Sequence, residues 1–385
     1  MLTEAGCRAR QARFLAALDQ GGIPGALLTA PRDIYYLTGV LPENKVYPYP
    51  NALFLGPGRP SWLITGSGSG SGRPLVDERA TYPVGEMATL NPDNHRRICE
   101  RLAGLAPRER GLSRIGYQEE DLPHSLACAF GAAAGPGEWV PVDGILQTLQ
   151  LRKDPDEIAC IRRAVRATLA GYSRAQQIIR PGVTELEVMT EAQAAAQRTS
   201  GEVHFFNGDF QSGTPGGFAR DRRVEAGELY IIDAWSDLNG YWCDMSRGWS
   251  VGGEPTRDQE SVYDHVAAVL RAVPEMARVG RDTRDFWAEL DCRLREHPLG
   301  REQGLVHHGG HGVGLRVHEP PDLNRDRGGI FEVGNVFTCE PAIYGADLRA
   351  GIRLENVFHI TEAGVEVLIE YPLSLRLDPA CPVPE

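Results

Sequence analysis

The chain has 385 residues, a formal net charge of −12 and 42% hydrophobic residues. This length is enough to bury two hydrophobic cores, so we expect two domains. The acidic balance excludes the basic face that nucleic-acid binding needs, and no apolar run approaches the length of a membrane span.

The first 150 residues predict a domain in which helices and strands alternate. Residues 8–20 predict an amphipathic helix with Phe14, Leu15 and Leu18 on one face. Short apolar segments predict buried strands, and a helix is expected near 93–104. These elements indicate an α/β domain at 1–150, with strand order, mixed or mostly parallel, left open. The three strand segments are 25–28, 52–55 and 62–64.

Residues 151–385 predict a second domain, which begins with two helices. Asp154-Pro155 is an N-cap followed by proline at the first helical position, and predicts a helix to about Gln177. Thr184 and Glu187 form a capping-box pattern that starts the next helix. Further helices are expected near 257–278 and 282–296. Strands fill the remainder, so we predict antiparallel sheet flanked by helices, an α+β arrangement.

Two aspartates lie on a predicted β-hairpin. The apolar run 229–232 ends in Asp233, Asn239-Gly240 is a hairpin turn signal, and Asp244 lies on the returning strand. Two close carboxylates repel, and the pKa of one rises unless a cation lies between them. The alternative is that Asp233 only ends a strand while Asp244 pairs with Arg247, and this pattern alone does not decide between them.

A histidine cluster follows, with glycines between its members. Four of the ten histidines fall within residues 307–318. Imidazole is a common metal ligand near neutral pH, and glycine lets neighbouring backbone approach closely. The cluster therefore indicates a binding site more than a set of unrelated surface residues. Its members are His307, His308, His311 and His318.

Glu340 and Glu355 each lie at or near the end of a β-rich apolar run. An ionised glutamate is costly to bury there without a partner; a cation would supply one, and Arg353 part of another. Either glutamate alone could instead be an exposed strand residue. Together with the hairpin and the histidines, they complete an oxygen-rich ligand set for two divalent cations, and hence a hydrolytic metalloenzyme. The set is Asp233, Asp244, His311, Glu340 and Glu355.

In its order and surroundings this set resembles the pita-bread metallopeptidases, which have the creatinase/methionine aminopeptidase fold. Residues 31–39, 151–158 and 180–185 are similar to segments of the Xaa-Pro aminopeptidase and prolidase branch. The resemblance implies a creatinase-like α/β domain at 1–150, followed by an α+β pita-bread catalytic domain at 151–385. It also implies a homodimer or a higher homo-oligomer.

The resemblance implies a role for each residue. Asp233 would chelate one metal, Asp244 and Glu355 would bridge the pair, and His311 and Glu340 would complete the second site. The cations would be manganese, zinc or cobalt, because an oxygen-rich set does not choose among them. A bridging hydroxide would attack the carbonyl before proline, with Glu340 as proton shuttle. Three residues would contact the substrate: His318 at the tetrahedral intermediate, His307 in the proline pocket, and Arg353 in support of the site.

Two departures from the resembled pattern concern the substrate. Proline-specific members carry a histidine upstream of the first metal aspartate, whereas residues 212–220 contain none, and His204 lies farther upstream. Trp235 stands where a small residue is common. We therefore expect an Xaa-Pro peptidase of aminopeptidase P or prolidase type, acting on short peptides. The alternatives are an enzyme for a small non-peptide substrate, an ectoine hydrolase-like amide hydrolase or a sulfoniopropionate lyase-like lyase, and a non-catalytic binding module.

The cysteines and the first residues indicate the compartment. The eight cysteines show no paired spacing, as is typical of reduced thiols in a cytoplasmic protein. The first residues hold no apolar stretch long enough for a signal peptide. We expect a soluble, cytoplasmic protein.

Overall fold

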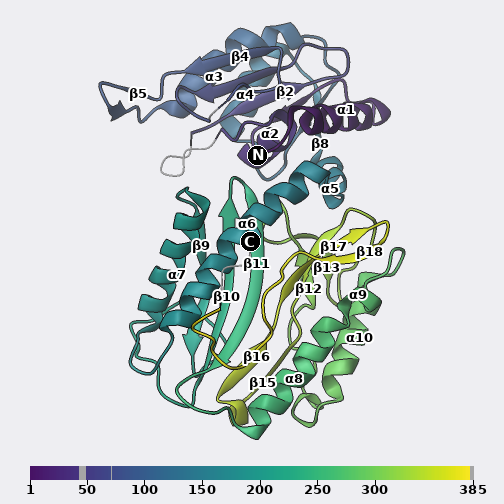
Figure 1. The fold of residues 1–385 in the computed structure, drawn as a ribbon. Helices are drawn as coiled ribbons and strands as arrows, with labels where there is room; N and C mark the ends of the chain where they lie inside the picture. The colour runs from purple at the N-terminus through teal and green to yellow at the C-terminus, as the bar shows by residue number, and fades with distance from the viewer. Residues whose placement is uncertain (43–48, 71, 382–385) are drawn as a thin grey trace. The chain divides into compact units, whose positions relative to one another are not determined.

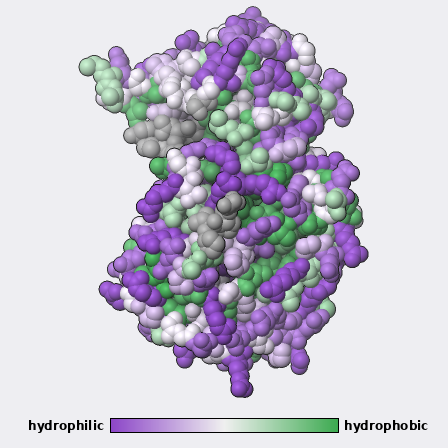
Figure 2. Space-filling view, viewed as in Figure 1, coloured by the Kyte–Doolittle hydropathy of each residue, from purple (hydrophilic) through white to green (hydrophobic). Residues whose placement is uncertain are grey.

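The computed structural model describes residues 1–42, 49–70 and 72–381 (Figure 1). The chain divides into two units, Met1–Gln150 and Leu151–Glu385. Within the described ranges, every helix is too short or too polar to cross a membrane. The visible face in Figure 2 is mainly hydrophilic, with hydrophobic residues in separate patches.

The N-terminal unit is built on a six-stranded mixed sheet in the order β4-β3-β2-β1-β7-β8. Strands β1–β2 and β2–β3 pair antiparallel and the other neighbours pair parallel, which settles the open strand order. The three predicted strands are confirmed. The sheet consists of β1 (Ala26–Leu28), β2 (Ala52–Leu55), β3 (Trp62–Gly66), β4 (Glu78–Tyr82), β7 (Arg114–Tyr117) and β8 (Glu138–Pro141).

Helices flank this sheet (Figure 1). The predicted first helix begins earlier than expected, because Thr3 caps it by accepting a hydrogen bond from the Gly6 N–H; Phe14 and Leu18 are buried as predicted. The helices are α1 (Glu4–Gln20), α2 (Pro31–Thr38), α3 (Asn94–Leu105), η1 (Ala106–Glu109), α4 (His124–Ala134) and α5 (Asp143–Leu151), and a short hairpin joins β5 (Gly85–Glu86) to β6 (Thr89–Leu90).

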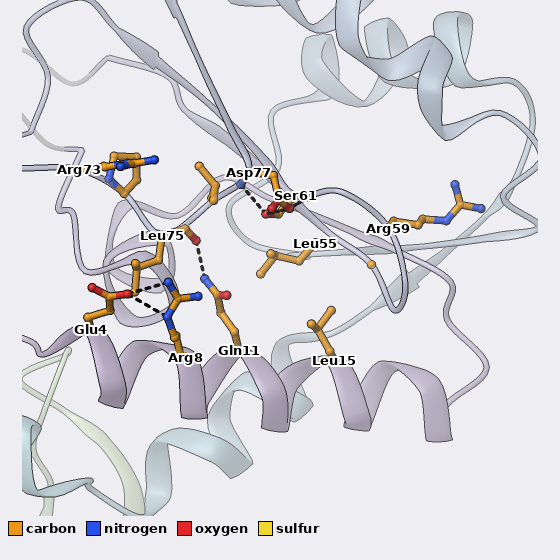
Figure 3. Close-up of a pocket in the computed structure, with 13 residues that line it drawn as sticks. Glu4, Arg8, Gln11, Leu15, Leu55, Arg59, Ser61, Arg73, Leu75 and Asp77 are labelled. Carbon is orange, nitrogen blue, oxygen red and sulfur yellow. Dashed lines mark hydrogen bonds and ion pairs between the residues drawn. The ribbon is translucent and has the colours of Figure 1, made fainter.

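A cavity of about 540 Å³ lies in the N-terminal unit, beside α1 and the segment 73–77 (Figure 3). Among its charged groups, Arg8 pairs with Glu4, and Asp77 accepts hydrogen bonds from the Ser61 backbone N–H and hydroxyl. This cavity contains none of the predicted histidines or metal-binding carboxylates. The chemistry must therefore be sought in the second unit.

The second unit contains three antiparallel sheets with helices packed against them, the predicted α+β arrangement. Helices α6 and α7 cover the sheet β11-β10-β9 (Figure 1). Helices α8, α9 and α10 pack against the sheet β13-β12-β14-β17-β18 and the hairpin β15-β16. The helices are α6 (Pro155–Ile178), α7 (Glu185–Ser200), α8 (Arg257–Arg271), α9 (Val273–Met276), α10 (Thr283–Arg295), η2 (Pro298–Gly300) and η3 (Ala346–Leu348).

The strands of this unit bear all of the predicted ligands or directly adjoin them. They are β9 (Phe205–Ser212), β10 (Leu229–Leu238), β11 (Tyr241–Ser250), β12 (Gly310–Gly312), β13 (Glu319–Leu323), β14 (Val336–Cys339), β15 (Ala342–Gly345), β16 (Ala350–Arg353), β17 (Asn356–Thr361) and β18 (Gly364–Val367).

The predicted helix starts in this unit are confirmed. The Asp154 N–H donates to Glu157 Oε2 at 2.9 Å, and the Thr184 N–H donates to Glu187 Oε2 at 2.7 Å. The prediction of one continuous helix at 257–278 is wrong, because the helix stops at Arg271 and a short turn of helix follows. Pro274 explains the break, since it lacks an N–H and its ring clashes with the preceding turn.

Lys153 and Glu319 form a buried ion pair that ties the start of the second unit to β13; their side chains are 1% and 4% exposed. Glu319 Oε2 also accepts a hydrogen bond from the Arg316 N–H at 3.1 Å. Because Glu319 directly follows His318, this pair fixes the backbone beside one of the predicted site residues.

We expect Lys153→Met to lower the free energy of unfolding by about 3 kcal/mol or more, because it leaves Glu319 buried without its cation. Urea denaturation at pH 7 would measure the change. The neighbouring Arg152→Met is the control: the Arg152–Glu332 pair is 65% and 41% exposed, so its loss should cost less than about 1 kcal/mol. Equal losses in the two variants would contradict this account.

Candidate metal centre

The hairpin β10–β11 carries the two predicted aspartates. Asn239 and Gly240 at its turn both have positive φ, 55° and 79°, as a two-residue hairpin turn requires. The strand register places Asp244 opposite Trp235, and Trp235 is two residues from Asp233 on the same face. The two carboxylates therefore share one face, as predicted.

The alternative pairing of Asp244 with Arg247 is wrong. The buried Arg247 guanidinium donates to the backbone oxygens of Ser246 and Glu355, at 2.8 and 2.6 Å, and to Asn356 Oδ1 at 2.8 Å. It joins β11 to the chain around β17. Asp244 gains no counter-charge from it.

The other three predicted ligands come from the second half of the unit. His311 lies in β12, Glu340 directly follows β14, and Glu355 directly precedes β17. His311 Nε2 lies 3.6 Å from Asp244 Oδ2 and 3.8 Å from Glu340 Oε1. The structure thus brings all five residues together, and each is at most 9% exposed.

Possible ligand atoms form four overlapping groups in the described chain. One includes His307 and His308 and another includes His318, whereas the remaining two consist only of predicted ligands and share Glu355. Asp233, Asp244 and Glu355 form one group, and His311, Glu340 and Glu355 form the other, with the ligand atoms of each group within 4.8 Å of one another. A carboxylate common to both groups is the arrangement expected of a residue that bridges two cations.

The electrostatics of the group favour a cation. Burial raises the pKa of Asp244 and of Glu355 well above the ordinary carboxyl value, and the neighbouring carboxylates raise both further. Burial also raises the pKa of Asp233, to about 6, although Arg353 opposes the rise. Burial lowers the pKa of His311 to about 4, which leaves its imidazole neutral and able to act as a ligand.

Glu340 differs from the other carboxylates. Burial acts to raise its pKa, but the hydrogen bond from His308 and the charges of His308, His311 and His307 bring it down to about 2. His308 Nδ1 lies 3.2 Å from Glu340 Oε1. Glu340 is therefore ionised at neutral pH in the metal-free protein.

The residues fit a hard divalent cation. In the described part of the chain, Asp244 Oδ1 and Glu355 Oε1 are buried and accept no hydrogen bond. Leaving such oxygens unsatisfied is unfavourable, and carboxylate oxygens are the ligands such cations prefer. The donor set and the two unsatisfied oxygens both point to a cation at this place.

Arg353 links Asp233 to residues that the sequence did not reveal. Its Nη2 lies 2.6 Å from Asp233 Oδ2 and 2.6 Å from Asp209 Oδ2, and its Nη1 donates to the Tyr344 hydroxyl at 2.8 Å. That hydroxyl lies 3.2 Å from His307 Nε2. Asp209, on β9 directly opposite Asp233, and Tyr344 were not predicted. The polar residues that alternate with buried Phe206, Gly208 and Phe210 could have indicated Asp209.

The remaining predicted residues lie around a cavity of about 240 Å³ next to the carboxylates. The exposed His318 ring stacks on that of His311, with centroids 3.6 Å apart and planes 20° apart. His307 and Arg353 also line the cavity, together with His308 and Trp235. His308 was in the predicted cluster but had no assigned role.

Comparison with known proteins identifies the family. Residues 159–362 match the model of metallopeptidase family M24, and residues 10–151 match the creatinase/prolidase N-terminal domain. The chain belongs to metallopeptidase family M24. The predicted fold, a creatinase-type N-terminal domain followed by a pita-bread catalytic domain, is confirmed, as is the enzyme class.

The relatives in this family include peptidases that are similar over nearly the whole chain. The Xaa-Pro dipeptidase of Pyrococcus furiosus is 30% identical over 365 residues, covering 93% of this chain and 97% of that protein. The probable dipeptidase PepE of Mycobacterium tuberculosis is 30% identical, covering 96% of each. Among solved structures, the Xaa-Pro dipeptidase from Bacillus anthracis has a TM-score of 0.78 at 24% identity, covering 96% of this chain and 99% of that one.

The raised pKa values predict how the stability of the metal-free protein depends on pH. The folded state holds protons that the unfolded chain releases near the ordinary carboxyl pKa of about 4. These bound protons stabilise the folded state relative to the unfolded chain. The full stabilisation is present below about pH 4, and it is lost as pH rises through the pKa values of the folded state, from about 6 for Asp233 upward. Glu340 is ionised in both states above pH 5 and does not alter this trend. His311, with its pKa lowered to about 4, opposes the trend up to the ordinary histidine pKa of about 6.5, so the fall is expected above that pH.

We therefore expect the melting temperature of chelator-treated protein to fall between pH 6.5 and pH 8, and excess manganese to remove most of the fall. Asp244→Asn should flatten the fall. At pH 8 this variant, without metal, should be more stable than metal-free wild type by at least about 1 kcal/mol, the value of one pKa unit. Calorimetry would measure both, and a metal-free wild type that gains stability over this range would contradict the account.

Proposed function

We propose that this metallopeptidase hydrolyses short peptides with proline after the scissile bond, as an Xaa-Pro dipeptidase or aminopeptidase P. The observation that carries the proposal is the buried group of four carboxylates and one imidazole, with His307 and His318 beside the same small cavity. The similar Xaa-Pro dipeptidase of Pyrococcus furiosus supports it. A cavity of about 240 Å³ is smaller than the roughly 300–1,000 Å³ of pockets for drug-sized ligands, which favours a short substrate.

In this proposal the site holds two divalent cations, manganese, zinc or cobalt. Asp233 would hold one, Asp244 and Glu355 would bridge the pair, and His311 and Glu340 would complete the second position. When bound, such a pair polarises a carbonyl and lowers the pKa of water to near neutrality.

The side chains of the chain itself would perform the proton transfers. Glu340 would accept a proton from the attacking water and pass it to the nitrogen of the leaving proline. His318 donates a hydrogen bond to the oxygen on which negative charge develops, which is worth most where water is scarce. The stack on His311 holds the ring of His318 in place.

His307 and Arg353 would position the substrate. The contact of His307 with the Tyr344 hydroxyl fixes its ring at the cavity wall, where it would face the proline ring. Arg353 fixes Asp233 and Tyr344 at once. The homodimer or higher homo-oligomer expected from the sequence stays a prediction. Light scattering would measure the number of subunits.

A second candidate keeps the metal site and changes the substrate. Residues 212–220 supply no histidine, and Trp235 lines the cavity. Both features favour a small non-peptide substrate, for an ectoine hydrolase-like amide hydrolase or a sulfoniopropionate lyase-like lyase. The test is a panel of Xaa-Pro dipeptides, longer Xaa-Pro peptides, acetylated diamino acids and sulfoniopropionate, each with manganese, zinc or cobalt and with a chelator control. Turnover of a non-peptide compound with no peptide cleavage would displace the first proposal.

Asp244→Asn should abolish activity and reduce bound metal, because a bridging ligand loses its charge. Elemental analysis of the dialysed protein, together with the peptide assay, would measure both effects. Full metal content in this variant would contradict the bridging role of Asp244.

His318→Ala should retain the metal while turnover falls about 10²-fold or more, on the scale of a lost oxyanion donor. The decrease should appear in kcat more than in KM, because the hydrogen bond strengthens as charge develops. A loss of metal as large as that in Asp244→Asn would show that His318 acts as a ligand.

A further inference from the structure

Trp235 is the one apolar side chain among the described residues that line the cavity. The others are carboxylates, histidines and Arg353. An apolar part of a substrate that enters this cavity therefore meets Trp235 or the histidine rings, because the remaining lining side chains are charged. The indole lies on the same face of β10 as Asp233, and its residue is paired with Asp244 across the hairpin.

A second aromatic ring extends the surface of Trp235. Phe218, from the segment between β9 and β10, contacts Trp235 edge to face, with ring centroids 6.4 Å apart and planes 68° apart. Phe218 is 64% exposed. The exposed ring is available to a ligand bound beside Trp235, and covering it would be favourable.

Hydrogen bonds hold the segment that carries Phe218 in place. The Gln211 side-chain amide donates to the Phe218 carbonyl at 2.8 Å, and the Thr214 hydroxyl donates to Gln211 Oε1 at 2.6 Å. The Phe210 N–H donates to the Gly217 carbonyl at 2.8 Å. Gly217 has φ of 130°, and a Cβ there would lie 2.7 Å from the Gln211 amide nitrogen, so only glycine fits. The backbone that carries the ring is thus held in place before a ligand arrives, which lowers the entropy cost of binding.

We propose that Trp235 and Phe218 form a subsite for the side chain of the residue before proline, and that the enzyme prefers large apolar residues there. The inference rests on the proposed function, in which His307 and Tyr344 serve the proline ring. The side chain before proline is then the substrate's other apolar part. Phenylalanine, leucine and methionine would pack on the indole, whereas glycine and alanine would leave it in water.

The test compares Phe-Pro with Ala-Pro in wild type and four variants. We expect wild type to favour Phe-Pro by its kcat/KM, and Trp235→Ala to reduce that preference about tenfold, mainly through KM, as expected for lost apolar contact. Trp235→Phe should keep most of the preference. Phe218→Ala should reduce the preference less than Trp235→Ala. Because Phe218 is exposed, its substitution should not disturb folding, so this variant tests the subsite even if Trp235→Ala folds poorly.

The chain offers a matched control. Phe205 is also exposed, at 45%, and also contacts a tryptophan, Trp242, with centroids 5.7 Å apart, but neither residue lines the cavity. Phe205→Ala should leave the preference unchanged. Bound metal, measured in every variant, should equal that of wild type.

The outcomes separate this inference from the proposed function. If wild type cleaves both dipeptides and Trp235→Ala changes their ratio by less than twofold, the subsite is wrong while the proposed function stands. A wild type that favours Ala-Pro would likewise overturn it. If metal-loaded wild type cleaves no proline peptide, the proposed function fails and this inference fails with it.

Discussion

Repulsion among buried carboxylates is the constraint on which this site depends. Asp233, Asp244, Glu340 and Glu355 are almost wholly buried and close together. Arg353 partners Asp233 and His308 partners Glu340, but Asp244 and Glu355 each keep a buried oxygen with no hydrogen bond in the described chain. A chain free to relax would separate these groups, so the surrounding frame must hold them together.

That frame consists of backbone contacts between strands. The Glu355 N–H donates to the Ser246 carbonyl at 3.0 Å, and the Glu340 N–H donates to the Gly309 carbonyl at 3.1 Å. Glycine permits the closest approaches: a Cβ at Gly208 would collide with the Asp233 carbonyl, and one at Gly310 with the Thr338 carbonyl. Each half of the unit thus has a glycine where a neighbouring strand passes a ligand strand. The apolar core behind the strands stabilises the arrangement against the charge repulsion.

The sequence predicts those parts of the site that local patterns determine. Asp233 and Asp244 are joined by a two-residue turn, so the hairpin alone brings them together. Asp209 depends on the pairing of β9 with β10, and the contact of Tyr344 with His307 joins residues far apart in the chain; no local pattern specifies either. The helix break at Pro274 was predictable from proline chemistry and was missed because the apolar period continues through it. The relative positions of His311 and His318 follow from the β12–β13 connection, which the spacing of seven residues did not determine.

The proposed metal ligands and the aromatic side chains at the cavity are different residues. Such a site could therefore change its substrate while it keeps its chemistry. The five proposed ligands lie in or beside strands whose register is fixed by pairing with their neighbours, so an altered ligand would disturb metal binding and packing together. Phe218 lies on a connecting segment, and Trp235 projects one side chain from an otherwise unchanged strand. Substitutions at these two positions alter the apolar surface that a substrate meets without moving any carboxylate. Under the proposed function, Trp235 would therefore change selectivity while the five proposed ligands stay in place, because altering the cavity wall costs less than altering a metal ligand.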